Sequence, residues 1–346
     1  SGSTVYTAGS SVLLMQTSAA TDLTLEGGGK TFGAVVIKNL NSSNNQYYIF
    51  FRDNNTIYGN VTIAIHNRSF LYFDGSINTF GNFSLHYNQA TIANVSESTI
   101  LYSHNFGNFT ITTNGLLPQL YCGSNNSFGQ VSLPAGTNWR INQASTQSLK
   151  GLTAVGDCQK LIYLYSTNSS VSANIADSDG GSNTLEFMRF NRINFSGASW
   201  TANNTLESIN TSGITVNPPA TQTYYWIGGT GNWNDPTKWS LSSGGPAVNC
   251  LPTRVDHVVF DNNSFPGSNQ TISLNVAAEV INMSWTSGVN ASPNFAGSQS
   301  LIINGDLTVS GVMDWQLSGS LTLRESIVLN SGVNWSHTNE IGRAHV

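Results

Sequence analysis

Two stretches of the chain repeat one pattern: Thr79-Phe80-Gly81-Asn82-Phe83-Ser84-Leu85 and Asn105-Phe106-Gly107-Asn108-Phe109-Thr110-Ile111. In both, an aromatic residue and a glycine precede residues that alternate between apolar and polar. Further copies, some of them degraded, extend the series in both directions, and the glycines of all copies are Gly33, Gly59, Gly81, Gly107, Gly129 and Gly151. Since successive glycines are 22 or 26 residues apart, the sequence contains an internal repeat of that length.

Each copy of this repeat predicts one coil of a solenoid. Alternation places Phe109 and Ile111 on the same face of a strand, and one coil of this length cannot bury that face unless another coil stacks on it. Stacked coils pair equivalent strands in parallel, so we expect a right-handed parallel β-helix, with the hand taken from the general bias of parallel crossovers. The residues expected to stack inside it are Phe32, Phe80, Phe106 and Phe128.

The repeat also predicts roles for its glycine and asparagine positions. Aligning the copies on their glycines puts Tyr58 and Lys150 at the aromatic position. Each glycine is expected at a corner whose conformation a Cβ would hinder. The asparagines that follow are expected to form an internal ladder that satisfies turn amides, and they are Asn60, Asn82 and Asn108. An internal ladder would leave their Asn-x-Ser/Thr sequons unavailable for glycosylation.

The composition and the repeat pattern change along the chain, and they predict an all-β protein with several segments. Residues 223–300 are rich in tryptophan, and residues 340–346 match the translation of a common sequencing adapter, so the natural chain is expected to continue. The expected segments are a β-solenoid at 1–222 (regular coils about 25–165, irregular closing part 166–222), a Trp-rich β module at 223–300, the start of a second solenoid at 301–339 and the adapter-derived peptide at 340–346.

Composition limits the classes of function. Only 9% of the 346 residues are charged, against roughly 25% in typical soluble domains. A content of 39% hydrophobic and 10% aromatic residues still provides for an ordered core. The net charge of -5 and the lack of a basic face argue against a nucleic-acid partner. No apolar run reaches the length of about 18 residues that a membrane span requires.

The Trp-rich segment holds the candidate binding residues. Trp226, Trp233 and Trp239 fall within fourteen residues, and flat aromatic rings suit the faces of sugars, so these three are candidates for binding a glycan or another partner. The alternative is a Trp-filled mini-core that caps a solenoid, because an open end exposes unpaired strand edges. The sequence favours the mini-core.

Metal, disulfide and catalytic sites have little support in the sequence. Asp177 and Asp179 begin a run that resembles a calcium loop, but no Glu closes it, so an Asp/Gly-rich turn is favoured. Cys122 and Cys158 are a candidate disulfide in an exported protein; the alternative is small buried hydrophobes. The acidic residues do not recur at coil spacing, so we expect no catalytic residues and no cofactor.

The second half of the chain resembles a known family. The residues that carry the resemblance are Tyr225-Trp226-Ile227-Gly228-Gly229-Thr230-Gly231-Asn232-Trp233, Trp239-Ser240, Val258-Val259-Phe260-Asp261 and Asn263-Ser264-Phe265. They are similar to a module of very long, repetitive, secreted surface proteins of Bacteroidota, which are typically exported by the type IX route. The spacing from Trp233 to Leu307 is also similar to the eight-glycine domain, although the glycine pattern is incomplete.

The resemblance implies an adhesin-like protein of the cell surface, outside the cell. Together with the repeat, it predicts a rigid spacer or adhesive segment of a larger protein that performs no catalysis and binds surface polysaccharide or another cell-surface component. Two alternatives stay open: a carbohydrate-active β-helix enzyme, similar to polysaccharide lyases or hydrolases, and a carbohydrate-binding module that uses the Trp-rich segment. An acidic groove across several coils favours the enzyme, and a uniform Ser/Thr/Asn surface favours the spacer.

Overall fold

The computed structural model contains two compact units, Ser1–Pro218 and Pro219–Val346, each with its own hydrophobic core. We call them unit 1 and unit 2 and describe each by itself. The one helical element among the described residues is the 3-10 turn η1 (Pro236–Lys238). The structure describes residues 12–17, 23–26, 31–39, 47–52, 56–57, 59–66, 69–73, 79–88, 97–100, 104–114, 118–181, 183–286, 292–330, 333–336 and 341–343.

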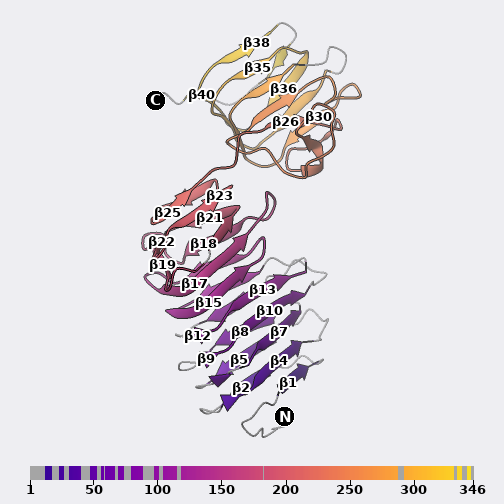
Figure 1. The fold of residues 1–346 in the computed structure, drawn as a ribbon. Helices are drawn as coiled ribbons and strands as arrows, with labels where there is room; N and C mark the ends of the chain where they lie inside the picture. Colours follow the sequence, from indigo (N-terminus) through magenta and orange to yellow (C-terminus); the bar gives the residue numbers. More distant parts are fainter. Residues whose placement is uncertain are drawn as a thin grey trace. The chain divides into compact units, whose positions relative to one another are not determined.

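Unit 1 is a stack of coils whose strands form three rows (Figure 1). The first row consists of β3 (Thr31–Phe32), β6 (Thr56–Ile57), β9 (Thr79–Phe80), β12 (Asn105–Phe106), the first halves of β15 (Asn126–Leu133) and β17 (Thr146–Val155), β19 (Ala173–Asp177) and β22 (Ile193–Ser196). The second row consists of β1 (Val12–Thr17), β4 (Ala34–Asn39), β7 (Val61–His66), β10 (Phe83–Asn88), β13 (Phe109–Thr113), the second halves of β15 and β17, β20 (Thr184–Glu186), β23 (Trp200–Asn203) and β25 (Ile214–Val216).

The third row is a separate sheet that runs the length of unit 1. It consists of β2 (Leu23–Glu26), β5 (Tyr47–Arg52), β8 (Ser69–Phe73), β11 (Glu97–Ile100), β14 (Gln119–Cys122), β16 (Asn138–Ile141), β18 (Ile162–Ser166), β21 (Met188–Asn191) and β24 (Glu207–Ile209). Neighbouring strands in all three rows pair in parallel. The predicted parallel β-helix is therefore confirmed, and its right-handed winding stays a prediction.

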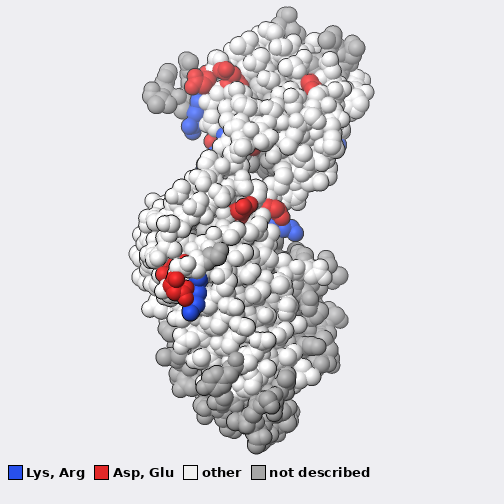
Figure 2. Space-filling view, in the orientation of Figure 1, with Lys and Arg blue, Asp and Glu red and all other residues white. Residues whose placement is uncertain are grey.

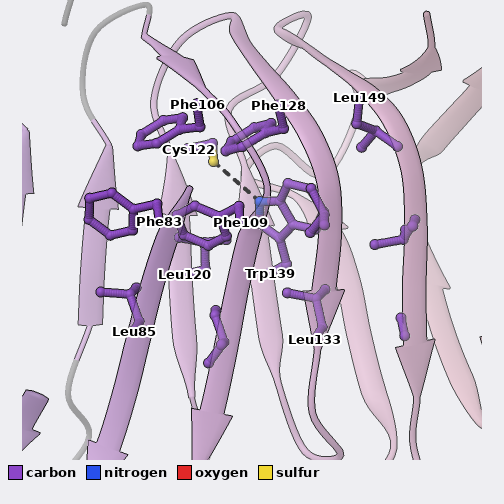
Figure 3. Close-up of a cluster of buried hydrophobic side chains, with 14 of the residues drawn as sticks. Phe83, Leu85, Phe106, Phe109, Leu120, Cys122, Phe128, Leu133, Trp139 and Leu149 are labelled. Carbon is purple, nitrogen blue, oxygen red and sulfur yellow. Dashed lines mark hydrogen bonds between the residues drawn. The ribbon is translucent and has the colours of Figure 1, made fainter. Parts of the chain in front are cut away.

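Aromatic side chains stack inside unit 1, as the repeat predicts for Phe80, Phe106 and Phe128; Figure 3 shows the rings of Phe106 and Phe128. The ring centroids of Phe80 and Phe106 are 4.9 Å apart and those of Phe106 and Phe128 are 5.0 Å apart, with nearly parallel planes. A second stack joins Phe83 to Phe109 at 5.4 Å. Rings of the two stacks meet edge to face, the arrangement that the charge distribution of aromatic rings favours.

The glycines of the repeat are required by contact between coils. A Cβ on Gly59 would lie 2.0 Å from the carbonyl oxygen of Gly33, and one on Gly107 would lie 2.8 Å from the carbonyl carbon of Gly81. The Gly129 N–H donates to the Gly107 carbonyl at 2.8 Å, so the backbones touch directly. The φ angles of Gly59, Gly107 and Gly129 lie outside the left-handed range. Close approach, and not a special backbone conformation, excludes a side chain here.

The register of the coils differs by one residue from the glycine alignment at two places. Phe32 pairs with Ile57, and Ile57 pairs with Phe80, so Ile57 and not Tyr58 holds the aromatic position in its coil. Phe128 pairs with Leu149, and not with Lys150. In both coils the inward position takes an aliphatic side chain that can be buried, and the Phe stack is interrupted there.

The asparagines that follow the glycines do form a ladder, but it lies on the surface. Asn82 and Asn108 are exposed. The Oδ1 of Asn82 accepts from the Asn108 N–H at 3.1 Å, and the Oδ1 of Asn108 accepts from the Gln130 N–H at 2.9 Å. The predicted pairing with turn amides is confirmed, whereas the predicted internal position is wrong. Burial therefore gives no argument against glycosylation of these residues.

The closing part of unit 1, residues 166–222, is more regular than the sequence indicates. Strands β19 to β25 continue all three rows in parallel. The Phe-Gly phrase is missing from these coils, but alternating inward residues such as Ile175 and Phe195 still fill the core. The periodicity of strands thus persists after the repeat phrase has been lost.

Unit 2 is a second solenoid with three sheets of its own (Figure 1). The first sheet consists of β28 (Trp239–Ser240), β26 (Thr223–Trp226), β29 (His257–Phe260), β32 (Met283–Trp285), β35 (Leu307–Val309) and β38 (Ile327–Leu329). The second consists of β27 (Gly231–Asn232), β30 (Thr271–Leu274), β33 (Asn294–Gly297), β36 (Met313–Leu317) and β39 (Val333–Trp335). The third consists of β31 (Ala278–Val280), β34 (Leu301–Ile303), β37 (Leu321–Leu323) and β40 (Ile341–Arg343).

The Trp-rich segment 223–300 opens the solenoid that the segment 301–339 continues, and both belong to unit 2. Strand β32 pairs in parallel with β35, and β33 with β36, which carries the sheets from one segment into the other. Tryptophans of the first coils occupy the same core as the aliphatic residues of the later ones. Strand β40 pairs with β37, and the adapter origin of residues 340–346 stays a prediction.

We expect the substitution Gly107→Ala to destabilise unit 1. The added Cβ would meet the Gly81 backbone, which cannot move without shifting a whole coil, and overpacking of this kind costs about 1–3 kcal/mol. The urea dependence of amide hydrogen exchange in β13 and β15 measures the change. The control Ser127→Ala alters an exposed side chain on β15 and should change stability by less than about 0.5 kcal/mol. Equal stability of the two variants would contradict the contact.

Candidate ligand-binding face

The three tryptophans proposed from the sequence as a sugar platform are buried in unit 2. Trp226 and Trp239 have no exposed surface, and Trp233 is 2% exposed. Their polar atoms are also occupied: the Trp239 indole N–H donates to the Trp233 carbonyl at 3.0 Å, and that of Trp226 donates to the Gly229 carbonyl at 2.7 Å. Rings enclosed in this way cannot stack on a sugar, so the platform is wrong and the mini-core is the correct interpretation.

The tryptophans belong to the structure that begins the second solenoid. Strand β28 pairs antiparallel with β26, beside its outer edge, with Trp226 opposite Trp239. Lys238, at the end of η1, donates from Nζ to the Gly228 carbonyl at 2.8 Å and so ties this segment to the first turn. An edge covered by an antiparallel strand cannot accept another coil, which explains why the tryptophans gather here.

The structure places Asp177 and Asp179 in a tight, hydrogen-bonded turn. One carboxylate oxygen of Asp177 accepts from the backbone N–H groups of Asp179 and Gly180, and the other accepts from the Asn183 side chain. Asp179 is ion-paired with Lys150 at 3.1 Å. These contacts are those of the Asp/Gly-rich turn that the sequence favours, and the calcium site stays a prediction.

The candidate disulfide between Cys122 and Cys158 does not form. Cys122 is a free thiol on the inward side of β14, whereas Cys158 is exposed in the turn between β17 and β18. Desolvation by burial raises the pKa of Cys122 to about 12, although the Trp139 indole N–H, which donates to its sulfur at 3.3 Å (Figure 3), lowers it. The alternative, a small buried hydrophobe, is correct for Cys122.

The outer face of the third row carries a feature that the sequence analysis missed. Five aromatic and cationic side chains from the four adjacent strands β14, β16, β18 and β21 lie there in two contacting groups, and we call them the Tyr-Arg ladder: Tyr121 with Arg140, and Tyr163 with Tyr165 and Arg189. They point outward because their neighbours along each strand, such as Trp139 and Leu164, are buried in the core. The ladder is half-buried, with Arg189 exposed.

Contacts within the ladder hold each side chain in place. The Arg140 guanidinium lies 4.4 Å from the centre of the Tyr121 ring, and that of Arg189 lies 4.7 Å from the Tyr163 ring. Tyr163 and Tyr165 stack on each other with centroids 4.4 Å apart. A cation over an aromatic face is attracted by about 0.5–1 kcal/mol at exposed sites, so these contacts order long side chains that would otherwise move freely.

Polar groups border the ladder on the same face. Glu207 accepts a hydrogen bond from the Arg189 guanidinium, and the Asn191 amide donates to the Tyr163 hydroxyl at 3.3 Å. Asn138 lies beside Tyr163 in the strand register. Guanidinium, phenol and amide groups together can donate hydrogen bonds to carboxylates and hydroxyls.

A second surface, lined by serine and asparagine side chains together with phenylalanines and glycines, follows the first row. Two shallow hollows of about 250 Å³ and 510 Å³ lie next to each other there and share Ser127 and Ser148. Beneath them Asn126 and Gln147 are buried and hydrogen-bonded to each other at 2.9 Å. These hollows present hydroxyl and amide groups and one paired lysine, Lys150. The aromatic side chains that line them, Phe106 and Phe128, are only 5% and 3% exposed, so the half-buried Tyr-Arg ladder is the better candidate for binding a ligand.

Metal-ligating clusters and membrane-spanning helices are two further features that bear on function. Within the described ranges, no three His, Cys, Asp or Glu side chains gather in a way that could hold a metal ion. The same part of the chain has no helix with the length and hydropathy that crossing a bilayer requires. A comparison with protein families, curated proteins and solved structures finds no match to this chain.

The substitution Trp233→Ala should unfold unit 2 and not merely remove a binding group. Removing a buried tryptophan costs about 3–5 kcal/mol, and the cavity would open beside Trp239 and Phe295. Hydrogen exchange of the β29 and β32 amides measures the effect. Leu241→Ala, which truncates a side chain that is 45% exposed in the same unit, is the matched control. A stable Trp233→Ala variant would show that the tryptophan is not part of the core.

Acid should weaken the turn that Asp177 holds. Desolvation by burial raises the pKa of this carboxyl, but hydrogen bonds from Asn183, Asp179, Gly180 and Gly181 outweigh it and lower the pKa below the ordinary 3.8. A carboxyl with a lowered folded-state pKa adds stability above its unfolded pKa, and that stability disappears as pH falls through the folded value. We therefore expect the melting temperature of unit 1 to fall below pH 3.8.

The variant Asp177→Asn separates this effect from general acid denaturation. It should be less stable than the parent at neutral pH, and the difference should shrink as pH is lowered below 3.8, because the parent carboxyl becomes neutral as well. Asp179→Asn, at an exposed ion pair, is the comparison variant. A constant difference between Asp177→Asn and the parent across this range would contradict the assigned role.

Proposed function

We propose that this chain is a structural and adhesive segment of a larger protein, located outside the cell, and that it performs no catalysis. The observation that carries the adhesive part is the Tyr-Arg ladder, a set of ordered aromatic and cationic groups on an outer face that the core does not need. The similarity of residues 224–310 to surface proteins of Bacteroidota supports the location. A polysaccharide or other cell-surface component is the partner that this proposal implies.

The solenoid architecture supports the structural part of the proposal. Each coil contacts only its neighbours, so stability is the sum of coil and interface contributions and length can increase without a larger core. Units 1 and 2 each have a continuous core of this kind. A stack of parallel strands joined by hydrogen bonds along its axis is well suited to act as a rigid spacer.

The character of the surface supports a spacer more than an enzyme. The described part of the face seen in Figure 2 is largely uncharged, and the acidic and basic groups on it lie in small, separate clusters. Outward positions of the second row are Thr62, Ser84, Thr110, Ser132 and Thr153, one from each successive coil. Such a surface suits many weak contacts distributed along the molecule.

Adhesion of the intact chain to surfaces tests this function. Beads that carry many copies should be retained on polysaccharide-coated surfaces far more strongly than one copy binds in solution, since multivalent attachment raises apparent affinity by about 10²–10⁴. The double variant Tyr121→Ala/Tyr165→Ala should lose retention, because it removes ladder rings. The control Thr201→Ala, an exposed position in β23 of the second row, should keep it.

Two results of this experiment would contradict the proposal. Equal retention on coated and bare surfaces would remove the adhesive role. The appearance of new reducing ends or shortened chains in the bound polysaccharide would show an enzyme instead. Circular dichroism of each variant distinguishes lost adhesion from lost folding.

A further inference from the structure

We propose that the Tyr-Arg ladder binds a polyuronate, an acidic polysaccharide with a carboxylate on each sugar, with its chain lying along the solenoid axis. This inference rests on the proposed adhesive function and names its ligand class. It follows from three properties of the face: the repeat distance of its groups, the type of its cations and the ordering of its rings.

The spacing of the ladder suits a linear polymer. Strand register aligns Tyr121, Arg140, Tyr165 and Asn191 in one column across β14, β16, β18 and β21. Adjacent strands are about 4.8 Å apart, so four groups cover about 14 Å along the axis. A polysaccharide offers similar groups at a regular interval of comparable size, which lets successive sugars meet successive strands. A compact ligand would use only part of this column.

The cations of the ladder favour a carboxylate. Arginine presents a planar fork of N–H donors that matches a carboxylate geometrically. The structure already contains one such pair on this face, between Arg189 and Glu207. The outward positions of β14, β16, β18, β21 and β24 carry Arg140, Arg189 and Glu207 as their charged residues. This face is therefore net positive, whereas the chain as a whole has a net charge of -5.

The rings hold the cations ready for binding. Arg140 stacked on Tyr121 and Arg189 stacked on Tyr163 lose side-chain freedom in the absence of ligand. Binding then costs less conformational entropy, because the groups already have the required arrangement. Neighbouring amides, such as those of Asn138 and Asn191, can exchange hydrogen bonds with sugar hydroxyls. Arg140 and Asn191 lie in this column, whereas Arg189 and Asn138 lie in the neighbouring one, so carboxylate recognition and hydroxyl recognition are combined on one face.

Binding of the intact chain to polygalacturonate is the test, with dextran as a neutral polymer and dextran sulfate as a sulfated one. Affinity electrophoresis and calorimetry should detect binding to polygalacturonate that weakens as salt is raised, since exposed charges are screened. The variant Arg140→Gln/Arg189→Gln should bind at least about tenfold more weakly. The control Lys150→Gln/Lys160→Gln removes the same two charges at exposed positions outside the ladder and should bind like the parent.

Several results would overturn the inference. Equal weakening in both double variants would show attraction to net charge alone. Binding of dextran as tight as that of polygalacturonate, or tighter binding of dextran sulfate, would reject the carboxylate as the recognised group. If no polymer binds, the ladder is not a polysaccharide site. The bead experiment tests the adhesive function separately. If the arginine variants bind polygalacturonate like the parent but the Tyr121→Ala/Tyr165→Ala variant still loses bead retention, the ligand class is wrong and the adhesive function stands.

Discussion

Backbone contact between successive coils, at the repeated glycines, is the constraint on which the Phe-Gly coils of unit 1 depend. Gly107 lies directly against Gly81, and Gly129 against Gly107. Because the coils meet there without side chains, the phenylalanines just before them approach within stacking distance. The strands that follow then begin in register, and their inward residues form continuous columns in the core. A side chain at the glycine position would disturb all of these contacts together.

The inward columns leave the outward positions of the solenoid outside the hydrophobic core. In the third row, one buried residue on each successive strand faces the core: Leu120, Trp139, Leu164 and Phe190. The outward residues next to them on each strand differ from coil to coil. The Tyr-Arg ladder occupies those positions in consecutive strands, where stacking of coils brings residues about twenty apart into contact. In unit 2 the antiparallel strand β28 pairs with β26 and covers the first edge of the same kind of parallel stack. Stacked parallel coils thus enclose a phenylalanine-rich core in unit 1 and a tryptophan-rich core in unit 2, and they leave the outer face free to vary.

Local patterns in the sequence predicted the strands and their inward faces, since alternation over a few residues decides both. Register was harder: the glycine alignment puts Tyr58 and Lys150 in the aromatic column, whereas Ile57 and Leu149 occupy it. The sequence does not show whether an extra residue between two coils lies in a loop or in a strand, so a register shift of one residue cannot be recognised from it. Trp233 illustrates a different limit, because composition alone does not distinguish a buried tryptophan from a binding one. The ladder was missed because Tyr121 and Arg140 become neighbours only after the third-row strands are aligned.

A double-mutant cycle on the stacked phenylalanines tests the central claim most directly. Phe106→Leu and Phe128→Leu should show a coupling energy of about 0.5–1.5 kcal/mol, because their rings are in contact. Phe80→Leu and Phe128→Leu, two coils apart with Phe106 between them, should be additive within about 0.5 kcal/mol. Equal coupling for both pairs, or none for the adjacent pair, would contradict a solenoid in which each coil is held by its immediate neighbours.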